Sequence, residues 1–162
     1  MIKHYKGKLG EFDYDDKEFK ITDPYNKEHL HYIGKGLLVD LPKGCINTRY
    51  MFARCELPRG FTLGNFDTSN VVDMDSMFYK CKIPKGFTLG DKFDTSNVRD
   101  MECMFSECEM PEGFTLGDKF NISKVRYINF MFSFCRYGGS PLSNKFGNYN
   151  MGSIKIINLL KS

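Results

Sequence analysis

The chain has 162 residues, of which 41% are hydrophobic and 27% are charged, and its formal net charge is +3. A chain of this length and composition folds as one domain with its own core, which excludes a disordered tail. The charge is small and of mixed sign along the chain, which argues against direct nucleic-acid binding, and no stretch approaches the roughly 20 apolar residues of a membrane span.

Residues 1–35 do not repeat and are expected to form an N-terminal β cap. In EFDYDDKEFKI (11–21), apolar and polar residues alternate around an Asp-Asp-Lys turn, which predicts a β-hairpin. HLHYIG (29–34) predicts a further strand. Together these strands would cover the first repeat and hide an edge that could otherwise pair with another chain.

The same region offers neither a metal site nor an export signal. His29 and His31 would share one face of a strand, but no third ligand accompanies them, so neither a metal nor another cofactor is expected. The start, MIKHYKGKLGEFDYDD, has lysines without the apolar stretch of about 7–15 residues that a secretory signal peptide requires. A cytoplasmic location, with no membrane partner, is therefore expected.

Three near-identical units follow. Their Met-Phe pairs, together with one upstream pair, begin at Met51, Met77, Met104 and Met131, which are 26, 27 and 27 residues apart. We name the units A (37–55, degenerate), B (57–81, LPRGFTLGNFDTSNVVDMDSMFYKC), C (83–108, IPKGFTLGDKFDTSNVRDMECMFSEC) and D (110–135, MPEGFTLGDKFNISKVRYINFMFSFC). A further degenerate unit spans 142–160. The repetition predicts a solenoid of about four coils over residues 36–135, with a C-terminal cap over 136–162 in the same folded unit.

Each unit divides into halves of different periodicity. In GFTLG, Phe87 and Leu89 would point to one side and Thr88 to the other, which predicts a short strand bounded by glycines. Asn97 and Asp100 resemble a helical capping box. The apolar residues that follow have helical spacing and predict a short helix: Val98, Met101, Met104, Phe105 and Cys108.

The expected fold class is therefore an α/β solenoid. Each coil would contain a short parallel strand and a short helix, and stacked coils would lie about 4.7–4.9 Å apart. Equivalent side chains would then form ladders: Phe61, Phe87 and Phe114; Leu63, Leu89 and Leu116; Met77, Met104 and Met131. One coil cannot bury its apolar face alone, so each copy would serve as the floor of the next.

The string FDTSNVxDMxxMFxxC, at 66–81 and 93–108, closely resembles the repeat of BspA-like leucine-rich-repeat proteins, a mycoplasma lipoprotein-type repeat of unknown function. The resemblance covers about residues 37–135. It implies a leucine-rich-repeat-like solenoid without catalytic residues or cofactor. Many members look like bacterial surface proteins whose repeats bind other proteins. This chain departs from them in lacking a lipobox cysteine near its start and a wall anchor, and a short version of this kind resembles a product of a phage or mobile element.

The cysteines follow the repeat. Four of them share one position and should form a column, in which adjacent coils would be close enough for a disulfide; reduced, buried thiols are the alternative that a cytoplasmic chain favours. These are Cys55, Cys81, Cys108 and Cys135. Cys103 lies outside the column and is expected to be the most reactive thiol. No Ser/His/Asp set or carboxylate pair is recognisable, so an enzyme is not expected.

Unit D departs from its sister units at three positions. Tyr127, Phe130 and Phe134 replace polar or charged residues at a spacing of i, i+3 and i+7, which would place them in one stripe of a helix. We call them the aromatic stripe. One hypothesis is that the C-terminal segment folds back over the stripe, with Tyr137, Phe146 and Tyr149 joining it. The other is a patch that binds a protein or forms a homodimer.

A second candidate surface lies on the opposite face of the predicted sheet. Thr62, Thr88 and Thr115 would form an exposed row, which we call the threonine row. The charged residues Arg59, Lys85 and Glu112 lie near it in the sequence. Leucine-rich-repeat solenoids commonly bind partners on the strand face, and a small polar row suits a protein better than an apolar ligand.

The sequence thus predicts a non-catalytic module that binds a protein. In the first version it is a cytoplasmic inhibitor or adaptor of a host protein, encoded by a phage or mobile element. In the second it is a fragment or relative of a bacterial surface adhesin. A third version, a nucleic-acid-contacting accessory protein, depends only on the basic ends of the chain.

Overall fold

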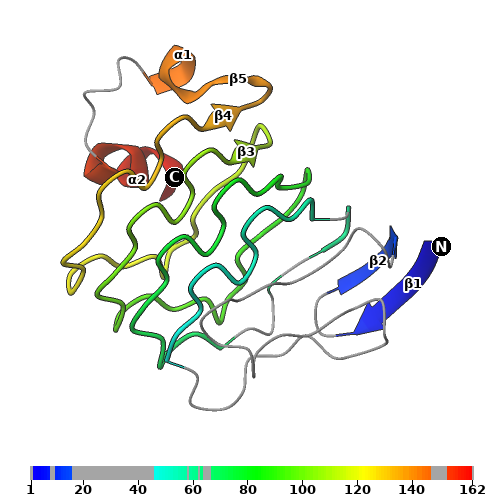
Figure 1. Cartoon of the computed structure of the whole chain (residues 1–162), viewed down its shortest axis with the longest axis horizontal. Coiled ribbons are helices and arrows are strands. Elements are labelled where there is room, and N and C mark those ends of the chain that lie inside the picture. Colours follow the sequence, from blue (N-terminus) through cyan, green and yellow to red (C-terminus); the bar gives the residue numbers. More distant parts are fainter. Residues whose placement is uncertain are drawn as a thin grey trace.

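The computed structural model describes residues 2–7, 10–15, 46–57, 59–61, 63, 67–146 and 153–161. Figure 1 shows β1 and β2 at one end of the molecule, α1 and α2 at the opposite end, and successive layers of chain between them. The elements are β1 (Ile2–Gly7), β2 (Gly10–Asp15), β3 (Glu109–Met110), β4 (Arg136–Tyr137), β5 (Ser140–Pro141), α1 (Leu142–Phe146) and α2 (Ser153–Lys161).

The N-terminal hairpin lies earlier in the chain than predicted. β1 and β2 pair antiparallel in a register that runs from Ile2 opposite Asp15 to Gly7 opposite Gly10. Residues 11–15 therefore form the second strand of a hairpin with β1, and residues 16–21 of the predicted hairpin lie outside the described residues. Glycines flank a two-residue connection at positions 8 and 9, and such a short connection favours pairing with the upstream strand. The rest of the predicted cap, with His29 and His31, lies outside the described residues.

Consecutive units pair through two rows of parallel backbone bridges. One row joins Asn47 to Asp73, Asp73 to Asp100 and Asp100 to Tyr127. The second row joins Glu56 to Lys82 and Lys82 to Glu109, and it continues where β3 pairs parallel with β4. Because β4 also pairs antiparallel with β5, this second row ends in a small mixed three-stranded sheet of order β3-β4-β5. The chain is thus a repeat protein in which each unit pairs with the next.

The predicted short helix in each unit is wrong. Residues 67–135 contain no helix, and the Met-Phe segment instead forms overlapping turns, in which Met77 and Tyr79 each donate their N–H to the carbonyl three residues earlier. Ser76 and Lys80 have φ angles of 54°, a left-handed conformation that interrupts a right-handed helix. The expected capping box is wrong as well, since Asp100 Oδ1 accepts a hydrogen bond of 2.9 Å from Glu102 N–H within an Asx turn.

The GFTLG segments of units C and D do not form strands either. Their alternation is nevertheless confirmed, because Phe87 and Leu89 are buried whereas Thr88 is exposed. Among the described residues of unit B, only one backbone hydrogen bond links its GFTLG segment to unit C, from Leu63 N–H to the Thr88 carbonyl at 3.5 Å. The glycines that bound the segment favour turns, and Gly86 and Gly90 both have positive φ angles.

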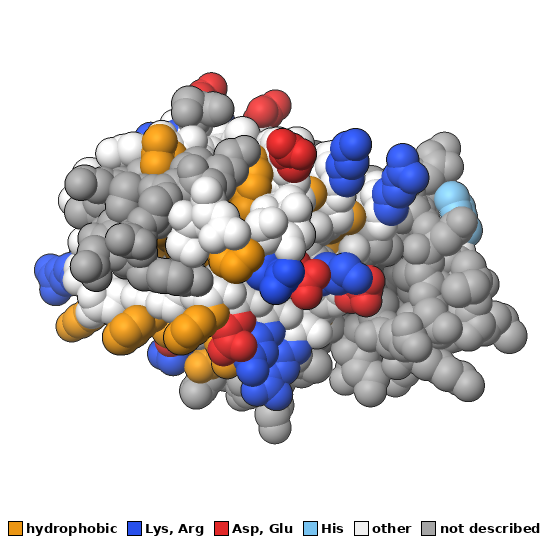
Figure 2. Space-filling view, turned by 90° about the horizontal axis from the view of Figure 1, so that it is seen from above, with side chains coloured by type: hydrophobic (Ala, Val, Ile, Leu, Met, Phe, Trp, Pro, Cys, Tyr) orange, Lys and Arg blue, Asp and Glu red, His pale blue; other side chains and the backbone are white. Residues whose placement is uncertain are grey.

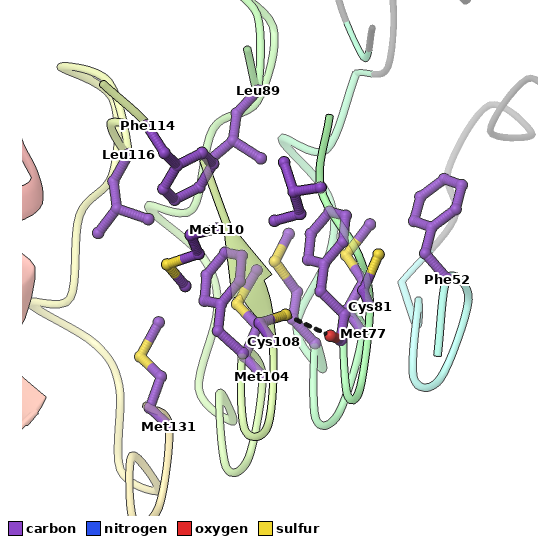
Figure 3. Packing of buried hydrophobic residues seen from close by; sticks show 14 of the residues in the cluster. Phe52, Met77, Cys81, Leu89, Met104, Cys108, Met110, Phe114, Leu116 and Met131 are labelled. Atoms are coloured by element: carbon purple, nitrogen blue, oxygen red, sulfur yellow. Dashed lines mark hydrogen bonds between the residues drawn. The ribbon is translucent and has the colours of Figure 1, made fainter. Parts of the chain in front are cut away.

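The core is a large cluster of buried phenylalanines with methionines and leucines. In one stack, the Phe78 ring lies parallel to Phe52 at 5.4 Å and to Phe105 at 5.2 Å, and Phe132 extends the stack. In a second stack, Phe61, Phe87 and Phe114 lie 6.2 and 6.4 Å apart, which confirms that predicted ladder. Edge-to-face contacts join the two stacks, as between Phe78 and Phe87 at 6.3 Å. Figure 3 shows the neighbouring methionine and leucine side chains pointing into the same core.

The C-terminal elements close part of the last unit. Ile157 and Leu160 of α2 are buried in the core, and Leu116 donates its N–H to the Leu160 carbonyl at 2.8 Å. Tyr137 of β4 is also buried, and its hydroxyl accepts a hydrogen bond from Gly113 N–H at 2.8 Å. α2 therefore supplies the acceptor that a further unit would otherwise offer to the GFTLG segment of unit D.

Candidate binding surface

The aromatic stripe is exposed. Tyr127, Phe130 and Phe134 have 55%, 66% and 75% of their surface accessible to solvent, among the highest values for the large hydrophobic residues of the described chain. Figure 2 shows exposed hydrophobic side chains gathered in a row on one face of the molecule. Large apolar side chains placed together in water are unfavourable, and on soluble proteins such patches often mark an interaction site.

The turns of the Met-Phe segment direct these rings outward. Phe130 and Phe134 both have φ angles of 57°, as Cys103 and Glu107 have 53° and 57° at the equivalent positions of unit C. The buried side chain between them, Phe132, stacks on Phe105 at 5.7 Å. The stripe therefore arises from alternation along overlapping turns and not from the helical spacing that the sequence suggested.

The described residues of the C-terminal segment leave the stripe exposed, which counts against the hypothesis that this segment folds back over it. Tyr137, which was expected to join the rings, is 9% exposed and bonds instead to the backbone at Gly113. Exposed fractions of 55–75% exclude a closed lid over the three rings. The side chains of Phe146 and Tyr149 lie outside the described residues.

The sister units carry polar side chains where unit D carries rings. Lys80 and Glu107 occupy the Phe134 position in units B and C, and they form a salt bridge of 3.3 Å. At the Tyr127 position, Asp73 lies 3.5 Å from Arg49 at its closest carboxylate oxygen. Burial raises the pKa of Asp73 above its ordinary value, although Asp75 N–H and Arg49 oppose this shift. At these two positions, unit D therefore has aromatic rings where the sister units have charged side chains.

The charge of the sequence also changes between units C and D. Residues 94–109 contain five acidic side chains and one basic side chain. The equivalent residues 121–136 contain no acidic side chain and the three basic residues Lys124, Arg126 and Arg136, all of which are exposed. Unit D thus combines exposed rings with positive charge.

The threonine row lies on a different part of the surface. Thr88 and Thr115 are exposed, as predicted, and both line a hollow of about 350 Å³ between units C and D. Asp91, Asp118 and Lys119 also line it, and the sequence analysis did not identify them. Lys119 Nζ donates to the Asp91 carbonyl at 2.6 Å. The structure does not describe Thr62; the charged neighbours Arg59, Lys85 and Glu112 are all exposed.

The described cysteines are free thiols. Cys108 Sγ donates to the Phe78 carbonyl and Cys135 Sγ to the Phe105 carbonyl, each at 2.7 Å (Figure 3 shows the first bond). Burial raises the pKa of Cys55 and Cys135 to about 12. Because the thiolate is the reactive form, the column acts as apolar filling of the core.

Two buried threonines that the sequence analysis missed connect the units. Thr95 is 1% exposed, its hydroxyl donates to the Asn121 carbonyl at 2.8 Å, and the same oxygen accepts from Asn121 N–H at 2.6 Å. Thr68 makes the equivalent pair of bonds to Asp94. In unit D the position is Ile122, which has no hydroxyl to make these bonds. The signal was present in the sequence as TSN, TSN and then ISK.

The described residues contain no group of three or more histidines, cysteines and acids that could hold a metal ion. In the part of the chain that the structure describes, no helix has the length and apolar character needed to cross a bilayer.

The repeat, the ring stacks and the exposed stripe provide the basis for comparison with known proteins. A family model described as a mycoplasma protein of unknown function, DUF285, matches residues 46–158. The match covers units B to D, the end of unit A and most of the C-terminal elements. Neither a curated protein nor a solved structure matches the chain.

Proposed function

We propose that this chain, which belongs to the DUF285 family of mycoplasma proteins of unknown function, is a non-catalytic repeat module that binds another protein. The observation that carries the proposal is the exposed aromatic stripe. A phenylalanine or tyrosine can bury roughly 150–250 Å² in an interface. At about 25 cal/mol per Å², covering three such rings would contribute several kcal/mol to a complex.

We further propose that the units form a leucine-rich-repeat-like solenoid. Two rows of parallel bridges at the spacing of the repeat and two stacks of phenylalanine rings support this arrangement. Such repeats differ from one another mainly at exposed positions, which leaves the surface free to specialise while the core is preserved. Unit D is the specialised one, because it alone among the aligned units has rings at all three positions of the stripe.

The aromatic stripe supports binding and not catalysis. The stripe consists of two phenyl rings and a phenol, none of which is a ready nucleophile, and the four thiols of the column are held in the core. In the version that we favour, the protein is a cytoplasmic inhibitor or adaptor of a host protein. The adhesin fragment and the homodimer remain the competing versions of a binding module.

The hollow beside the threonine row supports a second binding surface. Thr88 and Thr115 offer hydroxyls there, and Asp91, Asp118 and Lys119 offer charges of both signs. A polar, mixed-charge concavity suits the rim of a protein interface, whereas the aromatic stripe suits its centre.

A capture experiment with matched variants tests the proposal. Wild-type protein, the F130G/F134G double variant and the T88A/T115A double variant would each be immobilised and exposed to lysate of the source organism. Glycine suits both phenylalanine positions, because their φ angles are positive. We expect one dominant protein to be retained by wild type and T88A/T115A and lost with F130G/F134G.

The same experiment separates the alternatives. Loss of the retained protein with T88A/T115A alone would move the site to the threonine row. Equal retention by all three proteins would contradict both surfaces. If wild type retains nothing and light scattering shows a dimer that F130G/F134G abolishes, the stripe is a homodimer interface.

A further inference from the structure

In units A, B and C, the Met-Phe segment donates backbone N–H groups to the unit that follows. Cys103 N–H donates to the Asn129 carbonyl at 3.1 Å, and Glu107 N–H donates to the Ser133 carbonyl at 2.7 Å. Units A and B make the same bonds to the unit that follows each of them. In every case the acceptor is a backbone carbonyl of the adjacent segment. A chain that pairs with this row of N–H groups must therefore present oxygen acceptors to it.

In unit D, the same donor positions have no such partner. Phe130 and Phe134 are the equivalents of Cys103 and Glu107, and neither N–H has an acceptor among the described residues. Both belong to residues that are more than half exposed. Phe132 lies between them, and its N–H also has no acceptor among the described residues, but this residue is only 4% exposed.

The C-terminal segment closes part of the same outer face. Leu116 N–H is bonded to α2 through the Leu160 carbonyl, and β5 pairs with β4. The donors of Phe130 and Phe134 are therefore an edge that the described C-terminal elements leave open, next to the exposed rings. An unpaired row of backbone donors on a protein surface is a template for pairing with another chain.

We propose that this edge binds an extended, acidic peptide segment of a partner protein. Oxygen atoms of that segment accept hydrogen bonds from Phe130 and Phe134 N–H, and its apolar side chains pack on the aromatic stripe. This is peptide recognition by addition of a segment to an open edge. The inference rests on the proposed function and adds to it the chemical class of the bound segment and the backbone N–H groups that bind it.

The charge of unit D favours an acidic segment. Residues 121–136 carry the exposed basic residues Lys124, Arg126 and Arg136 and no acid, and backbone N–H groups that point together also attract negative charge. The acids of unit C lie one layer further from a segment placed on the outer side of unit D. A positively charged segment at this edge would therefore be closer to the basic residues of unit D, which repel it, than to the acids of unit C, which attract it.

A second copy of this chain does not satisfy the edge through the same surface. In a two-fold dimer each edge would face its own equivalent, so that Phe130 and Phe134 N–H groups would face donors and not acceptors. The donors therefore favour a different chain over a symmetric dimer.

Amide hydrogen exchange measured by NMR tests the open edge in the free protein. We expect fast exchange at Phe130 and Phe134 and slow exchange at Cys103 and Glu107, which are the bonded equivalents and serve as internal controls. Slow exchange at Phe130 and Phe134 in a monomer would overturn the inference, because it would show that the edge is already closed.

A short synthetic peptide that alternates Leu and Glu, with an alternating Leu and Lys peptide as control, tests the ligand. We expect the acidic peptide to slow exchange at Phe130 and Phe134, and F130G/F134G, which keeps the donors and loses the rings, to bind it about tenfold more weakly. Equal or tighter binding of the basic peptide would overturn the charge assignment, and binding that leaves both amides in fast exchange would overturn the edge.

The two proposals can fail separately. A captured protein that slows exchange at Thr88 and Thr115, and leaves Phe130 and Phe134 unchanged, would support a protein-binding module and overturn the edge. A dimer in which the Phe130 and Phe134 amides become protected would overturn the assignment to a different chain. No binding of the acidic peptide at any concentration, with fast exchange at both amides, would overturn the ligand class.

Discussion

At the scale of single residues, the left-handed positions distinguish this repeat. Each described Met-Phe segment places two residues other than glycine at positive φ, and in unit D both are phenylalanine. An L-residue in this conformation costs roughly 1–2 kcal/mol. The surrounding turns and inter-unit hydrogen bonds must supply that energy, so the exposed rings of the stripe are retained at some cost to stability.

Replacement of Phe134 tests this cost. Phe134→Gly should leave the free energy of unfolding unchanged or raise it by up to about 1 kcal/mol, because relief of the left-handed conformation offsets the greater entropy of glycine in the unfolded chain. Phe134→Val should lower it by about 1 kcal/mol, because a β-branched side chain tolerates a positive φ poorly. Urea unfolding of both variants would measure the difference, and a more stable valine variant would contradict the argument.

Thiol reactivity is a second property of single residues. Cys103 is only partly buried, but desolvation and the nearby carboxylates of Asp75 and Glu102 raise its pKa above the ordinary value of 9.0. We expect iodoacetamide to label Cys103 first among the five described cysteines. At pH 8 its labelling rate should be lower than that of a free thiol, and the rate should rise as the pH is raised through the pKa of Cys103. Mass spectrometry of timed samples would measure this. Earlier labelling of Cys81 or Cys108 in the folded protein would contradict it.

At the scale of elements, the units are joined by side chains as well as by backbone. Thr95 bonds both the N–H and the carbonyl of Asn121 from a buried position, and the unit that ends the series has isoleucine in its place. At this position, units B and C have a threonine whose hydroxyl bonds to the backbone of the next full unit, whereas unit D, the last full unit, has an apolar side chain. The consensus threonine therefore serves stacking and not binding.

Thr95→Val should lower the free energy of unfolding by about 1–3 kcal/mol, because it removes the hydroxyl that bonds both the N–H and the carbonyl of Asn121. Thr115→Val is the matched control on the exposed row, and we expect it to change the same quantity by less than about 0.5 kcal/mol. Thermal and urea unfolding would measure both variants. Equal effects would show that the hydroxyl of Thr95 makes no net contribution.

The sequence predicted the repeats but not their local conformation. The period, the inward residues Phe87 and Leu89 and the exposed Thr88 follow from spacing alone, because burial repeats wherever the units stack. The helix was wrong because the spacing from Val98 to Cys108 also fits overlapping turns, whose left-handed residues are not glycine and leave no signal in the sequence.

The site was predicted in the same partial way. The three rings of unit D were visible as departures from the pattern, and the structure shows that they are exposed. The donors of Phe130 and Phe134 could not be predicted, since every residue except proline carries an N–H and only the arrangement of neighbouring units reveals which lack acceptors.

At the scale of the whole molecule, stability depends on how the ends of the stack are closed. α2 inserts Ile157 and Leu160 into the core and provides an acceptor for Leu116 N–H. Terminal units of a stack lack a neighbour on one side, so capping elements must cover their apolar surface. The aromatic stripe lies at this end, beside a cap that covers only part of unit D.

Leu160→Ala should lower the free energy of unfolding by about 2–5 kcal/mol, because it removes buried methyl groups and leaves a cavity. The adjacent Leu159 is 45% exposed, and Leu159→Ala should change stability by less than about 0.5 kcal/mol. Calorimetry of the two variants would compare them. Similar melting temperatures would show that α2 does not close the core.

Units B and C make equivalent bonds to the units that follow them, and this gives the gene a simple way to change the protein. An in-frame duplication of residues 83–109 would insert one further unit, which could form the same bonds to the units before and after it. Deletion of one such unit would bring together two units that can also form these bonds. Ile122 and the aromatic stripe would stay in the last layer. Unequal recombination would therefore move the proposed binding edge away from the N-terminal hairpin in steps of about 4.7–4.9 Å, so that the number of layers would set the distance between the two ends.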